Sequence, residues 1–220
     1  MPKLTDAQQA ERRAHILDAA ERCFTRAGFH RTTMQDICKE ASASPGAVYT
    51  WFDSKEALIE GITSRNRDEV LASFGSMGHP DDFIAGMAAT LEECVLNRPR
   101  EKSVLCLEIA AEATRNSSVA QMMAKFDEAV SASLKGIMER AIEAGQISPA
   151  LPLKDLVAAM NVIAEGMFWR RAVDPAFDAA AAGRVFVAMV EAVLRPVAAP
   201  QKRKPNKINL KPMELAEQRS

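Results

Sequence analysis

Apolar residues recur every three or four positions along most of the chain, which is the spacing that places side chains on one face of an α-helix. Stretches of this kind cover residues 9–27, 55–74, 81–97, 101–114, 119–144, 153–172 and 177–194. Alanine and methionine are abundant, whereas runs of β-branched residues are scarce. Because alanine and methionine favour helices, the pattern predicts an all-α protein.

Residues 33–55, TMQDICKEASASPGAVYTWFDSK, contain two shorter helical stretches. Thr33 and Asp36 indicate the start of the first, because a threonine oxygen caps free N–H groups and an acid suits the first turn. Ser44 offers a second cap before Pro45, so a helix of about seven residues is expected there. Two short helices joined by a tight turn form a helix-turn-helix, whose second helix fits the major groove of DNA. The stretch therefore predicts DNA binding, although a plain helical hairpin with packed aromatic residues has the same spacing.

The residues expected to contact DNA lie at the front of this second helix and around it. Small residues such as Gly46 and Ala47 let the backbone approach base edges, while Tyr49, Trp51 and Lys55 can bond the phosphate chain. The full set of predicted DNA contacts is Thr33, Ser44, Pro45, Gly46, Ala47, Tyr49, Thr50, Trp51 and Lys55.

Residues 14–58 resemble the DNA-binding domain of the TetR/AcrR family of bacterial transcriptional regulators. The resemblance is carried by ILDAAERCFTRAGFHRTTMQDICKEA and by SPGAVYTWFDSKEAL, in which Tyr-x-x-Phe-x-x-Lys-Glu-x-Leu is the most specific part. One departure is Ser42, where the family usually has glycine. This position is expected to be left-handed, at a cost of about 1 kcal/mol for a residue other than glycine.

The resemblance implies an N-terminal three-helix domain with the helix-turn-helix and a C-terminal helical domain for ligand binding and dimerisation. The expected division is a flexible arm (1–8), the DNA-binding domain (9–55), the ligand-binding and dimerisation domain (56–195) and a disordered basic tail (196–220). It also implies a repressor whose dimer places two recognition helices about 34 Å apart on a pseudo-palindromic operator. A small-molecule effector would shift the helix that links the domains and so weaken DNA binding. A helix-turn-helix activator, or a regulator without an effector, is the alternative.

The resemblance places the effector pocket among the middle helices of the C-terminal domain. The candidate wall residues are Met87, Leu91, Leu105, Met122, Phe126, Met138, Met160 and Met167. Methionine is flexible and polarisable, so this set favours hydrophobic or aromatic effectors and suggests a multidrug efflux operon as the target. Taken one by one, each of these residues fits plain core packing better than a pocket wall. Glu108, Glu112 and Glu165 would pair with a cationic ligand if they face inward, or form a solvated surface if they do not.

The last two predicted helices are apolar over more than one stripe, so a contact on one side cannot bury them. The predicted dimerisation residues are Leu156, Ile163, Phe168, Val185, Met189 and Val193. A two-fold pairing of this helical hairpin into a four-helix bundle would cover both faces. The alternative is that both helices are the core of a single chain. The resemblance favours the homodimer.

Charge is unevenly distributed along the chain. Residues 1–55 hold eight Lys or Arg and seven Asp or Glu, residues 56–195 hold fourteen and twenty, and residues 196–220 hold six and two. The DNA-binding domain is therefore not strongly basic, and DNA binding requires Arg12, Arg13, Arg31 and Lys55 to share one surface. The tail is rich in proline and lysine and lacks periodicity, which is typical of disorder.

The sequence offers no basis for catalysis, a metal site or a cofactor. Cys23, Cys38, Cys94 and Cys106 lack C-x-x-C spacing, and a redox switch of Cys94 with Cys106 rests on their number alone. The three histidines are scattered, and no nucleophile–base pair or Gly-rich phosphate loop is present, which argues against an enzyme or carrier. No signal peptide or apolar run long enough to cross a membrane is found, so a cytoplasmic protein is expected.

Overall fold

The computed structural model of the chain describes residues 5–75 and 83–195, and the regular structure within them is entirely helical. The helices are α1 (Asp6–Ala27), α2 (Met34–Glu40), α3 (Pro45–Tyr49), α4 (Lys55–Ser73), α5 (Phe83–Leu91), α6 (Arg100–Ala113), α7 (Ser117–Glu143), α8 (Leu153–Val173) and α9 (Ala179–Leu194). A π-helical turn, η2 (Glu92–Leu96), continues α5. The predicted all-α class is confirmed.

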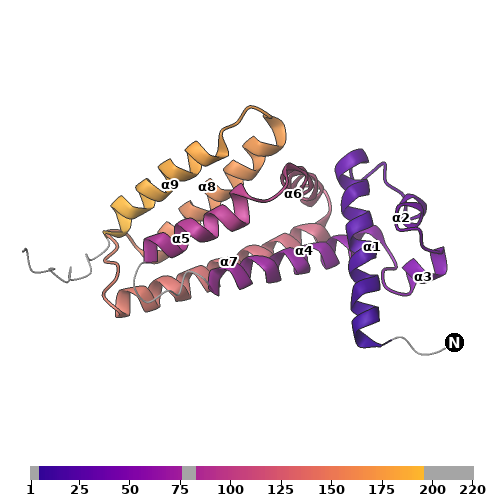
Figure 1. Cartoon of the computed structure of the whole chain (residues 1–220), viewed down its shortest axis with the longest axis horizontal. Coiled ribbons are helices and arrows are strands. Elements are labelled where there is room, and N and C mark those ends of the chain that lie inside the picture. Colours follow the sequence, from indigo (N-terminus) through magenta and orange to yellow (C-terminus); the bar gives the residue numbers. More distant parts are fainter. Residues whose placement is uncertain (1–4, 76–82, 196–220) are drawn as a thin grey trace, which may run out of the picture.

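The helices are arranged in two groups along an elongated molecule (Figure 1). α1, α2 and α3 form a unit at one end. α4 leaves this unit and runs beside α7, while α5, α8 and α9 lie over that pair. α6 lies across the end of the second group, next to α1. The helix-turn-helix is thus held at one end of the molecule, with α4 and α6 as its links to the rest.

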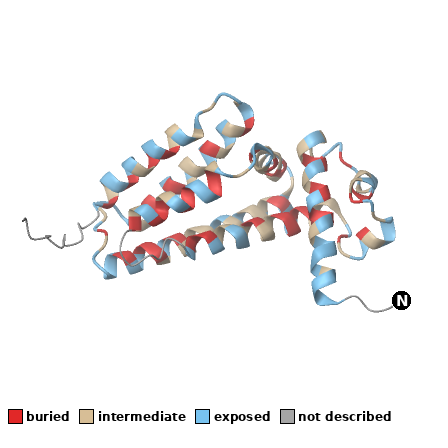
Figure 2. Ribbon diagram, in the orientation of Figure 1, coloured by how far each residue is buried: buried red, intermediate tan, exposed pale blue. Residues whose placement is uncertain are grey.

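Two apolar clusters form the interior (Figure 2). One joins α1, α2, α3 and the first half of α4, and it also contains Leu105 and Ile109 of α6 and Val119 of α7. The other joins the end of α4 with α5, η2, α7, α8 and α9. Burying one large aliphatic side chain contributes about 1.5–3 kcal/mol. Because Leu105 and Ile109 are buried in the first cluster, α6 contributes to the stability of the DNA-binding unit.

Capping decides where α1 and α4 begin, and α1 begins earlier than the sequence predicts. Thr5 and Gln8 form a reciprocal capping box, with N···O distances of 3.3 and 3.0 Å, so α1 begins at Asp6 and residues 6–8 are helical rather than part of an arm. Ser54 caps α4 through the Ala57 N–H at 3.1 Å. Glu56, in the first turn of α4, accepts a hydrogen bond from Asn116 Nδ2 at 3.3 Å.

Three predicted pieces lie outside the described residues, namely the basic tail at 196–220, the first four residues of the arm and the first two residues of the predicted helix 81–97. In the ranges 5–75 and 83–195, no helix is both long enough and apolar enough to cross a membrane.

Candidate nucleic-acid interface

Local hydrogen bonds define both helices of the helix-turn-helix. Thr33 and Asp36 cap α2 reciprocally: the Asp36 N–H donates to Thr33 Oγ1 at 3.2 Å, and the Thr33 N–H donates to Asp36 Oδ2 at 3.0 Å. These bonds hold the pKa of Asp36 below its usual value. Ser44 Oγ accepts the Ala47 N–H at 3.3 Å, and Pro45 takes the first helical position. Both predicted caps are confirmed, although α3 has five residues rather than about seven.

The turn between the two helices depends on a left-handed residue. Ser42 has φ +48°, which confirms the conformation expected from the sequence. The next residue, Ala43, donates its N–H to Cys38 O at 3.0 Å and so closes the turn. A residue with a Cβ atom is strained in this region by about 1 kcal/mol.

The rest of the unit holds this turn rigidly against α1 and α4. Val48 and Phe52 are buried below α3. Gly61 of α4 permits this packing, because a Cβ there would lie 3.0 Å from the Phe52 ring and 2.8 Å from Leu17 Cδ2. His15 Nε2 lies 2.9 Å from Ala41 O, which fixes the end of α2 to α1.

Several predicted DNA contacts are open to solvent at the front of α3. Ser44, Pro45, Gly46, Tyr49 and Thr50 are exposed, and Tyr49 has 51% of its surface accessible. No other atom lies within 4 Å of the place where a Cβ on Gly46 would stand. The tip of α3 is therefore open to solvent, and no atom of the described chain crowds the backbone at Gly46.

Three other predicted contacts are less free than the sequence suggested. Trp51 is half-buried and packs against the core of the unit, and Ala47 is also half-buried. Lys55 Nζ donates to Phe29 O at 2.6 Å and lies 4.2 Å from the centre of the Phe29 ring. In this structure Lys55 therefore ties the start of α4 to the α1–α2 turn. The sequence did not indicate this contact, because the two residues are far apart along the chain.

Sequence reasoning also missed two polar side chains beside α3. Gln35 and Lys39 are exposed on α2, one helical turn apart. Together they line a shallow groove of about 400 Å³ whose other walls are Cys38, Ser42, Ala43 and Pro45. The sequence does contain a signal for this pair. Gln35 and Lys39 are four positions apart, which places them on the side of α2 opposite the buried Ile37.

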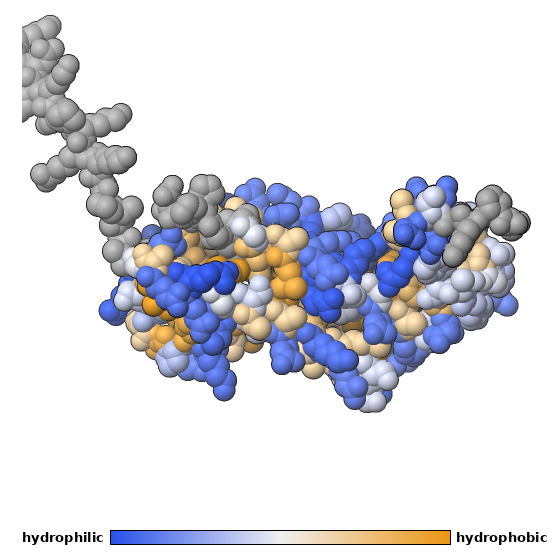
Figure 3. All heavy atoms as spheres, turned by 90° about the horizontal axis from the view of Figure 1, so that it is seen from below, coloured by the Kyte–Doolittle hydropathy of each residue, from blue (hydrophilic) through white to orange (hydrophobic). Residues whose placement is uncertain are grey.

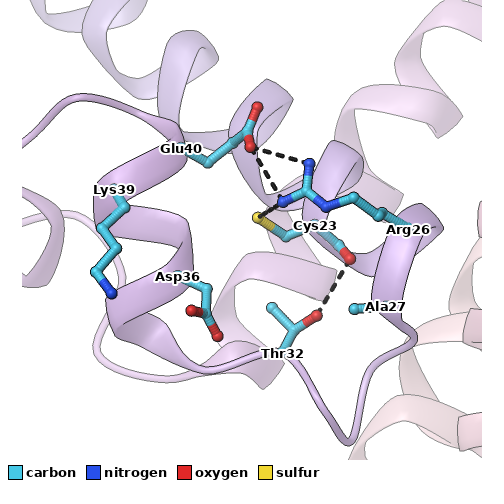
Figure 4. Close-up of a pocket in the computed structure, with 7 residues that line it drawn as sticks. All are labelled: Cys23, Arg26, Ala27, Thr32, Asp36, Lys39 and Glu40. Carbon is cyan, nitrogen blue, oxygen red and sulfur yellow. Dashed lines mark hydrogen bonds and ion pairs between the residues drawn. The ribbon is translucent and has the colours of Figure 1, made fainter.

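A second groove, of about 500 Å³, lies between α1 and α2 (Figure 4). The Arg26 guanidinium lies 3.1 Å from a Glu40 oxygen, and the hydrogen bonds from Arg22 and Arg26 lower the pKa of Glu40. The Thr32 hydroxyl donates to Cys23 O at 3.2 Å, and burial raises the pKa of the Cys23 thiol. Arg26, Glu40, Asp36 and the Thr32 hydroxyl bond within the chain, and Lys39 at the edge of the groove makes no such bond with the described residues. These bonds stabilise the unit.

The eight candidate pocket residues do not line one wall. Leu105 is buried in the core of the DNA-binding unit, and Met122 packs against that core. Phe126 is half-buried on α7. The remaining five, Met87, Leu91, Met138, Met160 and Met167, are buried in the C-terminal cluster.

The candidate acids also divide. The Phe29 N–H donates to Glu108 Oε2 at 3.4 Å, and His30 Nε2 lies 2.9 Å from Glu112 Oε2, so both acids face the α1–α2 turn. Glu165 is exposed on α8 near Asp127 of α7. Burial, together with the Glu165 charge, raises the pKa of Asp127 to about 6.

Burial raises the pKa of the Cys94 and Cys106 thiols, which keeps both protonated and disfavours a redox role. In the part of the chain that the structure describes, no three His, Cys, Asp or Glu side chains are placed to hold a metal ion.

The candidate dimerisation residues split between core and surface. Leu156 is buried in its own chain, and Ile163, Phe168 and Val193 pack against the same cluster. Val185 and Met189 of α9 are 60% and 54% exposed. Unpredicted exposed residues join them on α8, namely Val162, Trp169 and Val173. Figure 3 draws the molecule from below, the side on which α4 and α7 lie in Figure 1, and apolar side chains gather over the C-terminal group of helices in that view.

Comparisons with known proteins agree with this geometry. The family model for bacterial regulatory proteins of the tetR family matches residues 16–62. The HTH-type transcriptional regulator UidR of Escherichia coli (strain K12) is 34% identical over 145 residues, which are 66% of this chain and 72% of UidR. The HTH-type transcriptional repressor Rv1474c of Mycobacterium tuberculosis is 25% identical over 78% of this chain and 88% of its own.

Among solved structures, Salmonella enterica GusR superposes with a TM-score of 0.74 at 28% identity, covering 88% of this chain and all of GusR. SmeT, the repressor of the Stenotrophomonas maltophilia multidrug efflux pump SmeDEF, has the same fold, with a TM-score of 0.67 at 20% identity over 92% of this chain and 97% of SmeT. The chain belongs to the TetR family of bacterial regulatory proteins, and it is a DNA-binding transcriptional regulator rather than an enzyme.

Proposed function

We propose that this protein is a homodimeric repressor that binds a pseudo-palindromic operator and is released by a small hydrophobic or aromatic effector. The observation that carries the proposal is the separation of two exposed surfaces. The polar tip of α3 lies at one end of the molecule, and an apolar surface on α8 and α9 lies in the other group of helices (Figure 1).

The apolar surface supports the homodimer. Five apolar residues of these two helices are at least half exposed, namely Val162, Trp169, Val173, Val185 and Met189. Exposed apolar patches of this kind mark protein–protein contacts. A two-fold pairing of α8 and α9 with the same helices of a second chain covers these residues and presents two α3 helices together. Reading successive major grooves requires those helices to lie about 34 Å apart.

Contacts of α6 support an effector response. Gly28 has φ +78°, and a Cβ there would lie 3.1 Å from Glu108 Oε2, so a glycine lets α6 approach the α1–α2 turn closely. Glu112, only 3% exposed, lies 2.9 Å from His30 Nε2 on the same turn and 2.9 Å from Arg115 Nε. At its other end, α6 is held to α8 by Arg100 Nε, which donates to Arg171 O at 3.0 Å. A ligand that moves α6 therefore acts directly on the turn before α2.

The nature of the effector follows from the C-terminal core. Met87, Met138, Met160 and Met167 are buried there, and methionine adapts its shape to varied apolar ligands. By linkage, an effector weakens operator binding by the same factor by which DNA weakens effector binding. We extend the proposal to an efflux operon as the target and to action in the cytoplasm, where operator DNA lies.

A gel-shift titration on DNA from upstream of the protein's own gene tests the proposal. The wild type should bind as a dimer, and Tyr49→Ala should bind weakly while remaining dimeric in sedimentation. Tyr49 is preferred to Lys55 for this test, because Lys55 also holds Phe29 in place. Binding to no DNA at any salt concentration would refute the proposal.

A screen of hydrophobic and aromatic compounds tests the effector. At least one compound should lower DNA affinity, and genes bound in cells should include an exporter. If no compound changes the affinity, the protein is a regulator without an effector.

A further inference from the structure

The recognition helix itself carries few groups that can identify a base. Bidentate reading of a base edge takes Arg or Lys for guanine and Asn or Gln for adenine. α3 has the sequence PGAVY and contains none of these residues. The neighbouring hydroxyl groups take part in local hydrogen bonds, because Thr50 Oγ1 donates to Gly46 O at 2.7 Å and Ser44 Oγ accepts from Ala47 N at 3.3 Å. The Ser44 O–H can still donate one bond, but a single hydroxyl group does not make the bidentate contact of an amide or a guanidinium. α3 can therefore supply close apolar contact and the Tyr49 hydroxyl, and bidentate reading must come from another element.

α2 supplies such a side chain at the edge of α3. Gln35 is the second residue of α2, is exposed, and shares the 400 Å³ groove with Pro45, the first residue of α3. Lys39 lies one turn further along the same groove, and in Figure 4 its side chain points away from the Arg26–Glu40 ion pair. Within residues 5–75 and 83–195, neither Gln35 nor Lys39 forms a side-chain hydrogen bond or an ion pair.

The other polar side chains of α2 are committed to the fold. Asp36 closes the cap with Thr33, and Glu40 bonds Arg22 Nε at 2.7 Å. The left-handed turn at Ser42 brings the start of α3 back beside Gln35. Gln35 is thus the uncommitted amide of the helix-turn-helix that lies next to the tip of α3.

We propose that Gln35 determines operator specificity by reading an adenine in each half-site. Its amide oxygen accepts from adenine N6, its amide nitrogen donates to N7, and Lys39 contacts a neighbouring phosphate. This inference rests on the proposed insertion of α3 into the major groove.

Selection from a randomised double-stranded DNA library tests the inference with the purified full-length protein. The wild type should enrich a site with one A·T pair fixed in each half. Gln35→Arg should change that pair to G·C, because Arg pairs bidentately with guanine. Gln35→Ala should leave the position undefined and lower affinity for the wild-type site about fivefold or more per half-site.

The matched control is Gln121→Arg, which adds the same charge at an exposed glutamine of α7 outside the helix-turn-helix. It should leave the enriched site unchanged. Thermal unfolding of all variants should match the wild type, since Gln35 is exposed. An enriched wild-type site that Gln35→Arg and Gln35→Ala leave unaltered would overturn this inference alone. No enriched site with the wild type would overturn the proposed function, and this inference with it.

Discussion

The backbone of Ser42 is strained, and this strained conformation allows the turn between α2 and α3 to close. Its φ of +48° brings α3 back beside α2, and a glycine would adopt it without the Cβ clash. Ser42→Gly should therefore raise the free energy of unfolding by up to about 1 kcal/mol, measured by urea titration. Ala144→Gly is the control, because Ala144 is exposed at φ −76° and glycine gains nothing there. A Ser42→Gly protein less stable than the wild type would show that relief of the strain is smaller than the gain in unfolded-chain entropy that glycine brings.

The surroundings of the Asp127 carboxyl group disfavour its ionised form. Its pKa is raised to about 6 by burial and by Glu165. Between its unfolded pKa, about 4, and pH 6, the folded state binds the proton that the unfolded state has released, so stability falls as pH rises through this window. Asp127→Asn should remove that loss. The gain should be present at pH 7.5, absent at pH 4, and under about 1 kcal/mol because the side chain is partly exposed.

Urea titrations of Asp127→Asn at both pH values check this expectation. Glu128→Gln is the control, since Glu128 is an exposed neighbour on α7. An equal gain at pH 4 and pH 7.5 would mean that ionisation of Asp127 is not the cause.

At the scale of elements, α6 belongs to two parts of the molecule at once. Its apolar side packs into the core of the DNA-binding unit through Leu105 and Ile109. Its acids bond the α1–α2 turn, and its first residue, Arg100, bonds the end of α8. An element with both contacts can transmit a displacement that a surface loop would absorb.

Glu112→Gln tests this linkage. The substitution keeps an acceptor near His30 and Arg115 but removes the charge that pairs with Arg115, so stability should fall by about 1–2 kcal/mol. Amide hydrogen exchange should become faster in residues 28–33 and stay unchanged in α9. Glu139→Gln, an exposed acid paired with Lys135, should alter neither quantity. Unchanged exchange in residues 28–33 would exclude Glu112 as a support of the turn.

At the scale of the whole molecule, the exposed apolar residues of α8 and α9 are not covered by any part of the chain that the structure describes. The double variant Val185→Asp, Met189→Asp places two charges on that surface, which costs association several kcal/mol if the surface is buried between chains. Sedimentation should show monomers at concentrations where the wild type is dimeric. Operator affinity should fall at least about tenfold, because a monomer presents one reading helix. Leu151→Asp, on an exposed loop residue outside α8 and α9, is the control. A double variant that stays dimeric would remove this surface from the interface.

Local features of this protein were predictable from the sequence because they depend on neighbours along the chain. The caps at Thr33 and Ser44, the proline at the start of α3 and the left-handed turn at Ser42 involve bonds over a few residues. Helical periodicity is equally local, so the helices were found to within a few residues, except where Thr5 extended α1. Family membership followed from the same short region.

Only the tertiary structure decided which partner each exposed or buried side chain meets. Lys55 bonds Phe29, and Glu112 faces His30, across long separations in sequence. Leu105 entered the core of the DNA-binding unit rather than a pocket wall, and Leu156 entered its own chain's core rather than an interface. The apolar pattern of a helix states that a face is buried, but what buries it depends on how the helices cross, and that is set by packing of the whole chain.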